Sequence, residues 1–110
     1  MAYDDELANR TRELFARRPG VDEKQMFGGL AFLIGGHLAV CVMGGGGLMV
    51  RVPPADTDKL LARDHVSPMV MSGREVRGWV RVAGDGVKTK RQLQSWVDRG
   101  ADYATGLPAK

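Results

Sequence analysis

The residues best suited to bind a ligand lie in the segment Arg77-Gly78-Trp79-Val80-Arg81. If this segment is a β-strand, alternation places Arg77, Trp79 and Arg81 on one side of it, with the indole between two guanidinium groups. Such a platform could stack a nucleic-acid base while pairing with its phosphates, or it could hold an acidic peptide. Arginine also stacks on tryptophan for structural reasons alone, so a core or interface role for Trp79 is the alternative.

This platform belongs to a locally basic stretch of the chain. Residues 73–91 carry six basic side chains against two acidic ones, whereas the remainder has ten basic and eleven acidic residues. A basic surface attracts phosphate or an acidic partner, and a solvated strand and helix start is the alternative. The candidate residues for contact with a partner protein or nucleic acid are Arg74, Arg77, Trp79, Arg81, Lys88, Lys90 and Arg91.

Metal binding and nucleophilic catalysis are not indicated. His37 and Cys41 are four residues apart, which spans ~13 Å on a strand, whereas each ligand of one zinc ion lies about 2 Å from it. Cys41 stands in an apolar run, where burial should leave its thiol inert. The tetraglycine at 44–47 lacks the lysine of a phosphate-binding loop. We predict no catalytic residue, no metal site and no cofactor; an enzyme whose site is assembled from distant residues is a further alternative.

Composition predicts one globular domain over residues 1–110. Hydrophobic residues make up 44% of the chain and the formal net charge is +3, which is ordinary for a protein that folds around a single core. The single cysteine excludes an internal disulfide and favours a reducing compartment. The first residues are acidic, unlike a signal peptide, and no apolar stretch approaches the roughly 20 residues of a membrane helix. We therefore expect a cytoplasmic protein.

Glycine-punctuated apolar runs predict consecutive antiparallel strands. A capping box at Thr89 and Gln92 marks the start of the last helix, and Gly106 marks its end. The expected order is α-β-β-β-α-β-β-α, an α+β fold in two layers with helices packed on an antiparallel or mixed sheet. The elements are a helix over 4–18, strands over 26–34, 37–43 and 48–52, a short helix over 55–63, strands over 67–71 and 77–82, and the last helix.

The second of these strands bears on assembly. Alternation predicts Leu38, Val40 and Val42 on one side and Ala39, Cys41 and Met43 on the other. Because both faces are apolar, both should be covered. Helices can cover one face of so small a sheet. The other is covered either by a second copy in a homodimer or by the domain's own helices and loops.

Four segments together resemble the N-terminal domain of the TfoX/Sxy family. They are Lys24-Gln25-Met26-Phe27-Gly28-Gly29-Leu30-Ala31-Phe32, Leu48-Met49-Val50-Arg51-Val52, Pro68-Met69 with Gly73-Arg74, and Leu93-Gln94-Ser95-Trp96-Val97. The Met-Phe-Gly-Gly motif is the most specific of them. The resemblance runs over almost the whole chain and implies the same element order in a small α+β domain.

The resemblance also implies a role. The proteins that give the family its name are bacterial regulators of natural competence, thought to act with the cyclic AMP receptor protein, and they carry a further C-terminal domain that these 110 residues do not include. No catalytic or ligand residue is carried over from the family. We therefore expect a non-enzymatic regulatory module that acts through contacts with a protein, either a transcription regulator or a second copy. Direct nucleic-acid binding through the segment from Arg74 to Arg91 is the alternative.

Overall fold

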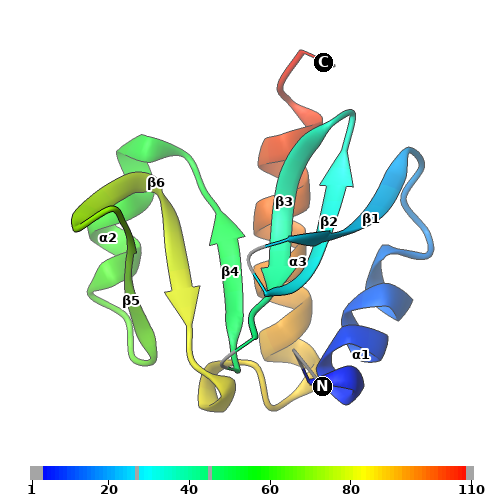
Figure 1. Ribbon diagram of the computed structural model, residues 1–110, viewed down its shortest axis with the longest axis horizontal. Helices are drawn as coiled ribbons and strands as arrows, with labels where there is room; N and C mark the ends of the chain where they lie inside the picture. Colours follow the sequence, from blue (N-terminus) through cyan, green and yellow to red (C-terminus); the bar gives the residue numbers. More distant parts are fainter. Residues whose placement is uncertain (1–3, 27, 45, 109–110) are drawn as a thin grey trace.

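The computed structural model describes residues 4–26, 28–44 and 46–108, and within them three α-helices pack on one antiparallel sheet (Figure 1). The strands lie in the order β1-β2-β3-β4-β6-β5. This confirms the predicted α+β class and decides between an antiparallel and a mixed sheet. The elements are α1 (Asp5–Phe15), β1 (Val21–Met26), β2 (Gly29–Ile34), β3 (His37–Val42), β4 (Leu48–Arg51), the 3₁₀ turn η1 (Pro54–Asp56), α2 (Thr57–Leu61), β5 (Val66–Met71), β6 (Arg74–Val82), the 3₁₀ turn η2 (Gly84–Gly86) and α3 (Lys90–Thr105).

Side-chain caps fix the starts of the two long helices. The Asp4 carboxylate accepts hydrogen bonds from the backbone N–H groups of Glu6 and Leu7, at 2.9 and 3.2 Å. At α3, Thr89 Oγ1 accepts from the N–H of Gln92 at 3.1 Å, and the Gln92 side chain accepts from the N–H of Thr89 at 3.0 Å. Each cap satisfies donors that a helix leaves free at its first turn. The predicted capping box is confirmed.

One strand was not expected. The apolar pattern predicts a single strand beginning at Met26, but Met26 ends β1 and its partner Gly29 begins β2. The four residues 22–25 are polar and exposed, so β1 shows none of the apolar alternation by which a half-buried strand is recognised. Phe27 of the Met-Phe-Gly-Gly motif lies outside the described residues.

The main core lies between the sheet and the helices. Phe15 of α1 stacks on Phe32 of β2, with ring centres 5.0 Å apart and planes 7° from parallel. The apolar stripe of α3 is buried throughout against the sheet. Its members are Leu93, Trp96, Val97, Ala101 and Ala104.

The alternation predicted for β3 is wrong at Leu38, because the strand contains a bulge. Phe32 pairs with Val40 and Leu33 pairs with Leu38, so Ala39 is an extra residue without an opposite partner. Such an insertion reverses the facing of the residues beyond it. Ala39 therefore packs with Val40 towards the helices, and Leu38 lies on the opposite side of the sheet with Cys41.

The sheet is joined narrowly at its centre. The pairing of β3 with β4 covers only Val40–Val42 and Leu48–Val50, and beyond these pairs the two strands diverge in front of α3 (Figure 1). The sheet thus consists of two three-stranded halves, β1-β2-β3 and β4-β6-β5, which are joined only by this short pairing of β3 with β4. Among the described helices, none is long and apolar enough to span a bilayer.

Candidate functional site

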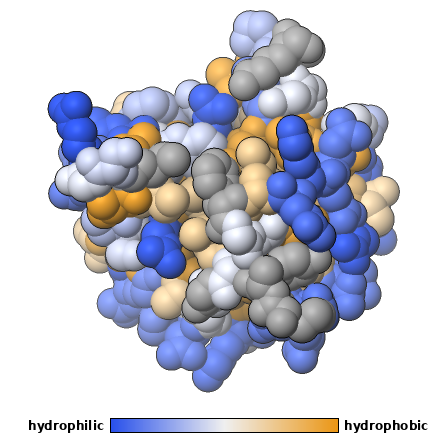
Figure 2. All heavy atoms as spheres, in the orientation of Figure 1, coloured by the Kyte–Doolittle hydropathy of each residue, from blue (hydrophilic) through white to orange (hydrophobic). Residues whose placement is uncertain are grey.

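A second apolar cluster lies on the side of the sheet that faces away from the helices, here called the helix-free face. Four of its members, Ala31, Cys41, Met49 and Met69, are buried, and the other five are partly exposed. All nine come from strands or from a residue that follows one, and no helix residue of the described chain belongs to the cluster. Figure 2 looks onto this face and shows apolar side chains between hydrophilic ones at the periphery. The partly exposed members are Met26, Leu33, Leu38, Met43 and Trp79.

Trp79 is held on this face by an arginine from the neighbouring strand. The guanidinium carbon of Arg51 lies 5.2 Å from the centre of the Trp79 ring, within the range of a cation–π contact. The same guanidinium lies 5.6 Å from the ring of Tyr103 on α3. The indole therefore does have a cationic neighbour, but it is Arg51 of β4, which is not among the predicted site residues.

The predicted grouping of Arg77 with Trp79 and Arg81 is wrong for Arg77. Its guanidinium lies 3.2 Å from both carboxylate oxygens of Asp58 on α2 and donates to the Pro54 carbonyl at 3.1 Å. Arg81, in contrast, is the Cα partner of Met49, and directly opposite residues in a sheet share a face. Two of the three predicted residues, Trp79 and Arg81, thus lie together on the helix-free face.

Gly78 interrupts the alternation of β6, so that Arg77 lies on the opposite side of the sheet from Trp79. Its φ of +91° belongs to a region that residues with a Cβ rarely adopt. Between the pairs Pro68–Val80 and Val70–Glu75, β6 contains three more residues than β5, so its alternation is interrupted there. The Gly78 N–H donates to Thr57 Oγ1 at 2.9 Å and its carbonyl accepts from the N–H of Val52 at 2.9 Å. A glycine inside a strand pattern often marks a bulge, so Gly78 is the feature of the sequence from which this interruption could have been predicted.

The basic residues of the 73–91 segment are spread over the molecule. Arg74 lies at the β5–β6 turn, whereas Lys88, Lys90 and Arg91 lie at and before the start of α3. At ~3.3 Å per residue, β6 separates these two groups by about 25 Å. Lys88 is also engaged locally, because its Nζ lies 3.3 Å from the Asp85 carboxylate. The seven predicted residues therefore do not form one patch.

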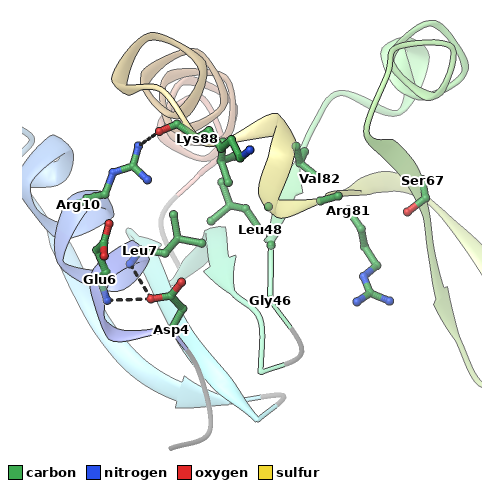
Figure 3. Close-up of a pocket in the computed structure, with 14 residues that line it drawn as sticks. Asp4, Glu6, Leu7, Arg10, Gly46, Leu48, Ser67, Arg81, Val82 and Lys88 are labelled. Atoms are coloured by element: carbon green, nitrogen blue, oxygen red, sulfur yellow. Dashed lines mark hydrogen bonds between the residues drawn. The ribbon is translucent and has the colours of Figure 1, made fainter.

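A cavity of about 560 Å³ opens between the start of α1, the β3–β4 loop and the end of β6 (Figure 3). Three basic residues line it, together with Asp4 and Glu6. Arg10 is turned towards the Lys88 carbonyl, to which it donates at 2.9 Å, whereas Arg81 extends away from α1 (Figure 3). Because these cations do not converge on one point, the cavity is not built as an anion site.

The family of the chain is shown by comparison with known proteins. A family model described as the TfoX N-terminal domain matches residues 13–104. The chain belongs to the TfoX N-terminal domain family. Comparison with curated proteins gave no match. The resemblance drawn from the four sequence segments is thereby confirmed, and with it a domain of the kind found in competence regulators.

Among the described residues, neither histidine of this TfoX N-terminal domain is hydrogen-bonded to an acidic or nucleophilic side chain. The His37 ring donates from Nε2 to the carbonyl of Pro108. His65 lines an open cavity of about 530 Å³ with Asp64 and Ser95, but no hydrogen bond joins these three side chains. Within the described ranges, no three His, Cys, Asp or Glu side chains gather as metal ligands do.

Cys41 is the buried nucleophilic group of the domain. Its side chain is 0% exposed, and burial raises the pKa of the thiol to about 11. The Sγ atom lies 3.9 Å from the Met26 carbonyl oxygen and 3.8 Å from that of Val42, as a weak donor to both. At neutral pH the group is a neutral thiol that fills space in the helix-free face.

Proposed function

We propose that this TfoX N-terminal domain is a non-enzymatic regulatory module that binds a protein partner with its helix-free face. The observation that supports this proposal is the cluster of methionine, leucine and tryptophan side chains on a face without a covering helix among the described residues. Methionine and aromatic residues are enriched at protein interfaces, and methionine adapts its shape to a partner.

Basic side chains border the same surface. Arg51 stacks on Trp79, and Arg81 lies beside it across from Met49. Tryptophan and arginine are the residue types that most often dominate the energy of an interface. We therefore propose that the partner presents apolar side chains to the cluster and acidic ones to Arg51 and Arg81.

The compartment is also part of the proposal, and the family and the cysteine support it. We place the domain in the bacterial cytoplasm, where it would act in transcription regulation. An unpaired thiol such as Cys41 is suited to a reducing compartment. Detection of the tagged native protein in the cytoplasmic fraction tests this part; recovery from the membrane or periplasm would contradict it.

A capture experiment tests the binding face. The tagged domain is used as bait in an extract of its native cells, with and without nuclease, beside the variants Leu38→Glu and Arg17→Glu. Leu38 is partly exposed in the cluster, whereas Arg17 is exposed after the end of α1 on the other side of the sheet. We expect nuclease-resistant capture by the wild type and by Arg17→Glu, and at least a tenfold loss with Leu38→Glu. Equal capture by a folded Leu38→Glu variant would reject the helix-free face.

The second candidate function is direct binding of nucleic acid. It is favoured by the position of Trp79 and Arg81 on one face, because a partly exposed aromatic ring beside a cation can stack a base while the cation pairs with phosphate. This function predicts that affinity falls steeply with salt as counterions are released. A binding curve that does not change between low and high salt would exclude it.

A further inference from the structure

The two edges of the sheet are built differently. The β5 edge contains Pro68, which has no N–H to donate, and its register with β6 is interrupted. The β1 edge pairs with β2 over all six residues without a shift, and it contains neither proline nor a bulge. Proline and bulges are among the devices by which proteins block an edge against pairing. Of the two edges, β1 is therefore the one with an uninterrupted ladder. Its exposed charges, on Asp22, Glu23 and Lys24, protect it against strands that do not complement them.

The alternation of an antiparallel ladder shows which β1 backbone groups point outwards. Met26 and Gly29 are paired across a two-residue connection, and such a closing pair exchanges hydrogen bonds within the hairpin. Counting back from Met26, every second residue bonds to β2 and the residues between them point their N–H and C=O groups away from the sheet. The outward residues are Val21, Glu23 and Gln25.

We propose that β1 pairs with β1 of a second copy of this chain, antiparallel, about a two-fold axis at Glu23. A two-fold axis perpendicular to the sheet keeps the helices of both copies on the same side, so it must pass through one residue of β1. Centring the axis on Asp22 or on Lys24 would place like charges opposite each other. Centring it on Glu23 places Asp22 opposite Lys24 of the second copy, twice, and lets all three outward residues form backbone hydrogen bonds.

The negative charge of each Glu23 carboxylate at the centre is balanced by Arg12 of the same copy. The Arg12 guanidinium donates to both carboxylate oxygens of Glu23, at 2.7 and 2.8 Å, which lowers the pKa of that carboxyl. Arg12 belongs to α1, so this ion pair lies on the helix side of the sheet. The two copies would thus bring together a row of two arginines and two glutamates on one side and two Asp–Lys pairs on the other.

This dimer goes beyond the proposed function and can fail separately from it. A sheet that continues across two copies presents both helix-free faces in the same direction. One partner with two sites, or two partner chains, could then be held together. Capture lost in a Leu38→Glu variant that still dimerises would reject neither β1 pairing nor the binding face, because Leu38 lies on β3 and takes no part in the pairing of β1.

Analytical ultracentrifugation of the full chain, at protein concentrations up to about 0.5 mM, tests whether the dimer forms. We expect the wild type to dimerise, Lys24→Asp to weaken the dimer at least tenfold, and the double variant Asp22→Lys/Lys24→Asp to restore it with the charges exchanged. Both positions are exposed, so the fold should tolerate the changes. Lys90→Asp, an equal charge change at the start of α3, is the control and should dimerise as the wild type does.

Three outcomes would overturn the proposal. They are a wild-type chain that stays monomeric over the whole range, a folded Lys24→Asp variant that dimerises as tightly as the wild type, and a double variant as weak as Lys24→Asp alone. The second would assign the dimer to another surface, and the third would show that charge, but not this register, affects association.

Discussion

Arg51 stacks on Trp79 across the junction of β4 and β6, with the guanidinium carbon 5.2 Å from the ring centre. The two residues are Cα partners in the sheet. Beyond Val50 the ladder between β3 and β4 has ended, and at that opening the same guanidinium lies 5.6 Å from the ring of Tyr103. One side chain therefore connects two strands with the helix behind them and holds the indole at the helix-free face.

Replacing Arg51 by methionine should remove this connection and lower the stability of the domain. The variant keeps an apolar stem of similar length and removes the cation, so we expect a loss of about 1 kcal/mol in the free energy of unfolding. Urea denaturation measures it. Arg74→Met, at the exposed arginine that begins β6, is the control and should stay within about 0.5 kcal/mol of the wild type. Equal effects of the two variants would contradict the role of Arg51.

Because the bulge in β3 lies close to Gly100 of α3, we predict that a side chain at Gly100 lowers the stability of the domain. A Cβ placed on Gly100 would lie 2.5 Å from the carbonyl oxygen of Ala39, the extra residue of the bulge. Alanine normally favours a helix over glycine by about 1 kcal/mol, but overpacking against rigid backbone costs about 1–3 kcal/mol. We expect Gly100→Ala to destabilise the domain by up to about 2 kcal/mol in urea denaturation.

The matched control for that variant is Gly84→Ala, because a Cβ on Gly84 would meet no atom within 4 Å. It should change the free energy of unfolding by less than about 0.5 kcal/mol. A Gly100→Ala variant that is more stable than the wild type would show that helix propensity outweighs the contact with Ala39.

Patterns carried within one segment predicted most of the fold. The capping box at Thr89 and Gln92, and the glycine-punctuated apolar runs, required no knowledge of the rest of the chain. What failed depends on pairing between segments. The bulge at Ala39 is set by the register of β3 against β2, and the polar strand β1 exists because β2 offers it a partner.

The candidate site was predicted in part for the same reason. Trp79 and Arg81 were grouped correctly because two residues of one strand separated by one position share a face. Arg77 was misplaced, since the positive φ of Gly78 interrupts that alternation. Arg51 was missed entirely, because nothing in a single strand indicates which side chain of its neighbour will stack on the indole.

Thr57 tests how β6 is held against α2. This buried threonine accepts a hydrogen bond at 2.9 Å from the N–H of Gly78. Thr57→Val keeps the shape of the side chain and leaves that buried donor without a partner, which costs about 1–3 kcal/mol. We expect a loss of this size in the free energy of unfolding. Thr105→Val, at an exposed threonine, is the control and should have an effect below about 0.5 kcal/mol; a loss as small for Thr57→Val would show that water satisfies the donor.

The raised pKa of Cys41 predicts a loss of stability in alkaline solution. Burial raises the pKa of this thiol from about 9 to about 11. Between these two pH values the unfolded chain loses the thiol proton while the folded chain keeps it, so the stability that burial of the neutral thiol provides is present below pH 9 and declines towards pH 11, by at most about 1.4 kcal/mol per pH unit. Urea denaturation of the wild type and Cys41→Ala at pH 8 and pH 10.5 separates the contribution of Cys41 from the effects that both proteins share. We expect the wild type to lose more stability than the variant over that interval, and equal losses would show that Cys41 ionises in the folded domain.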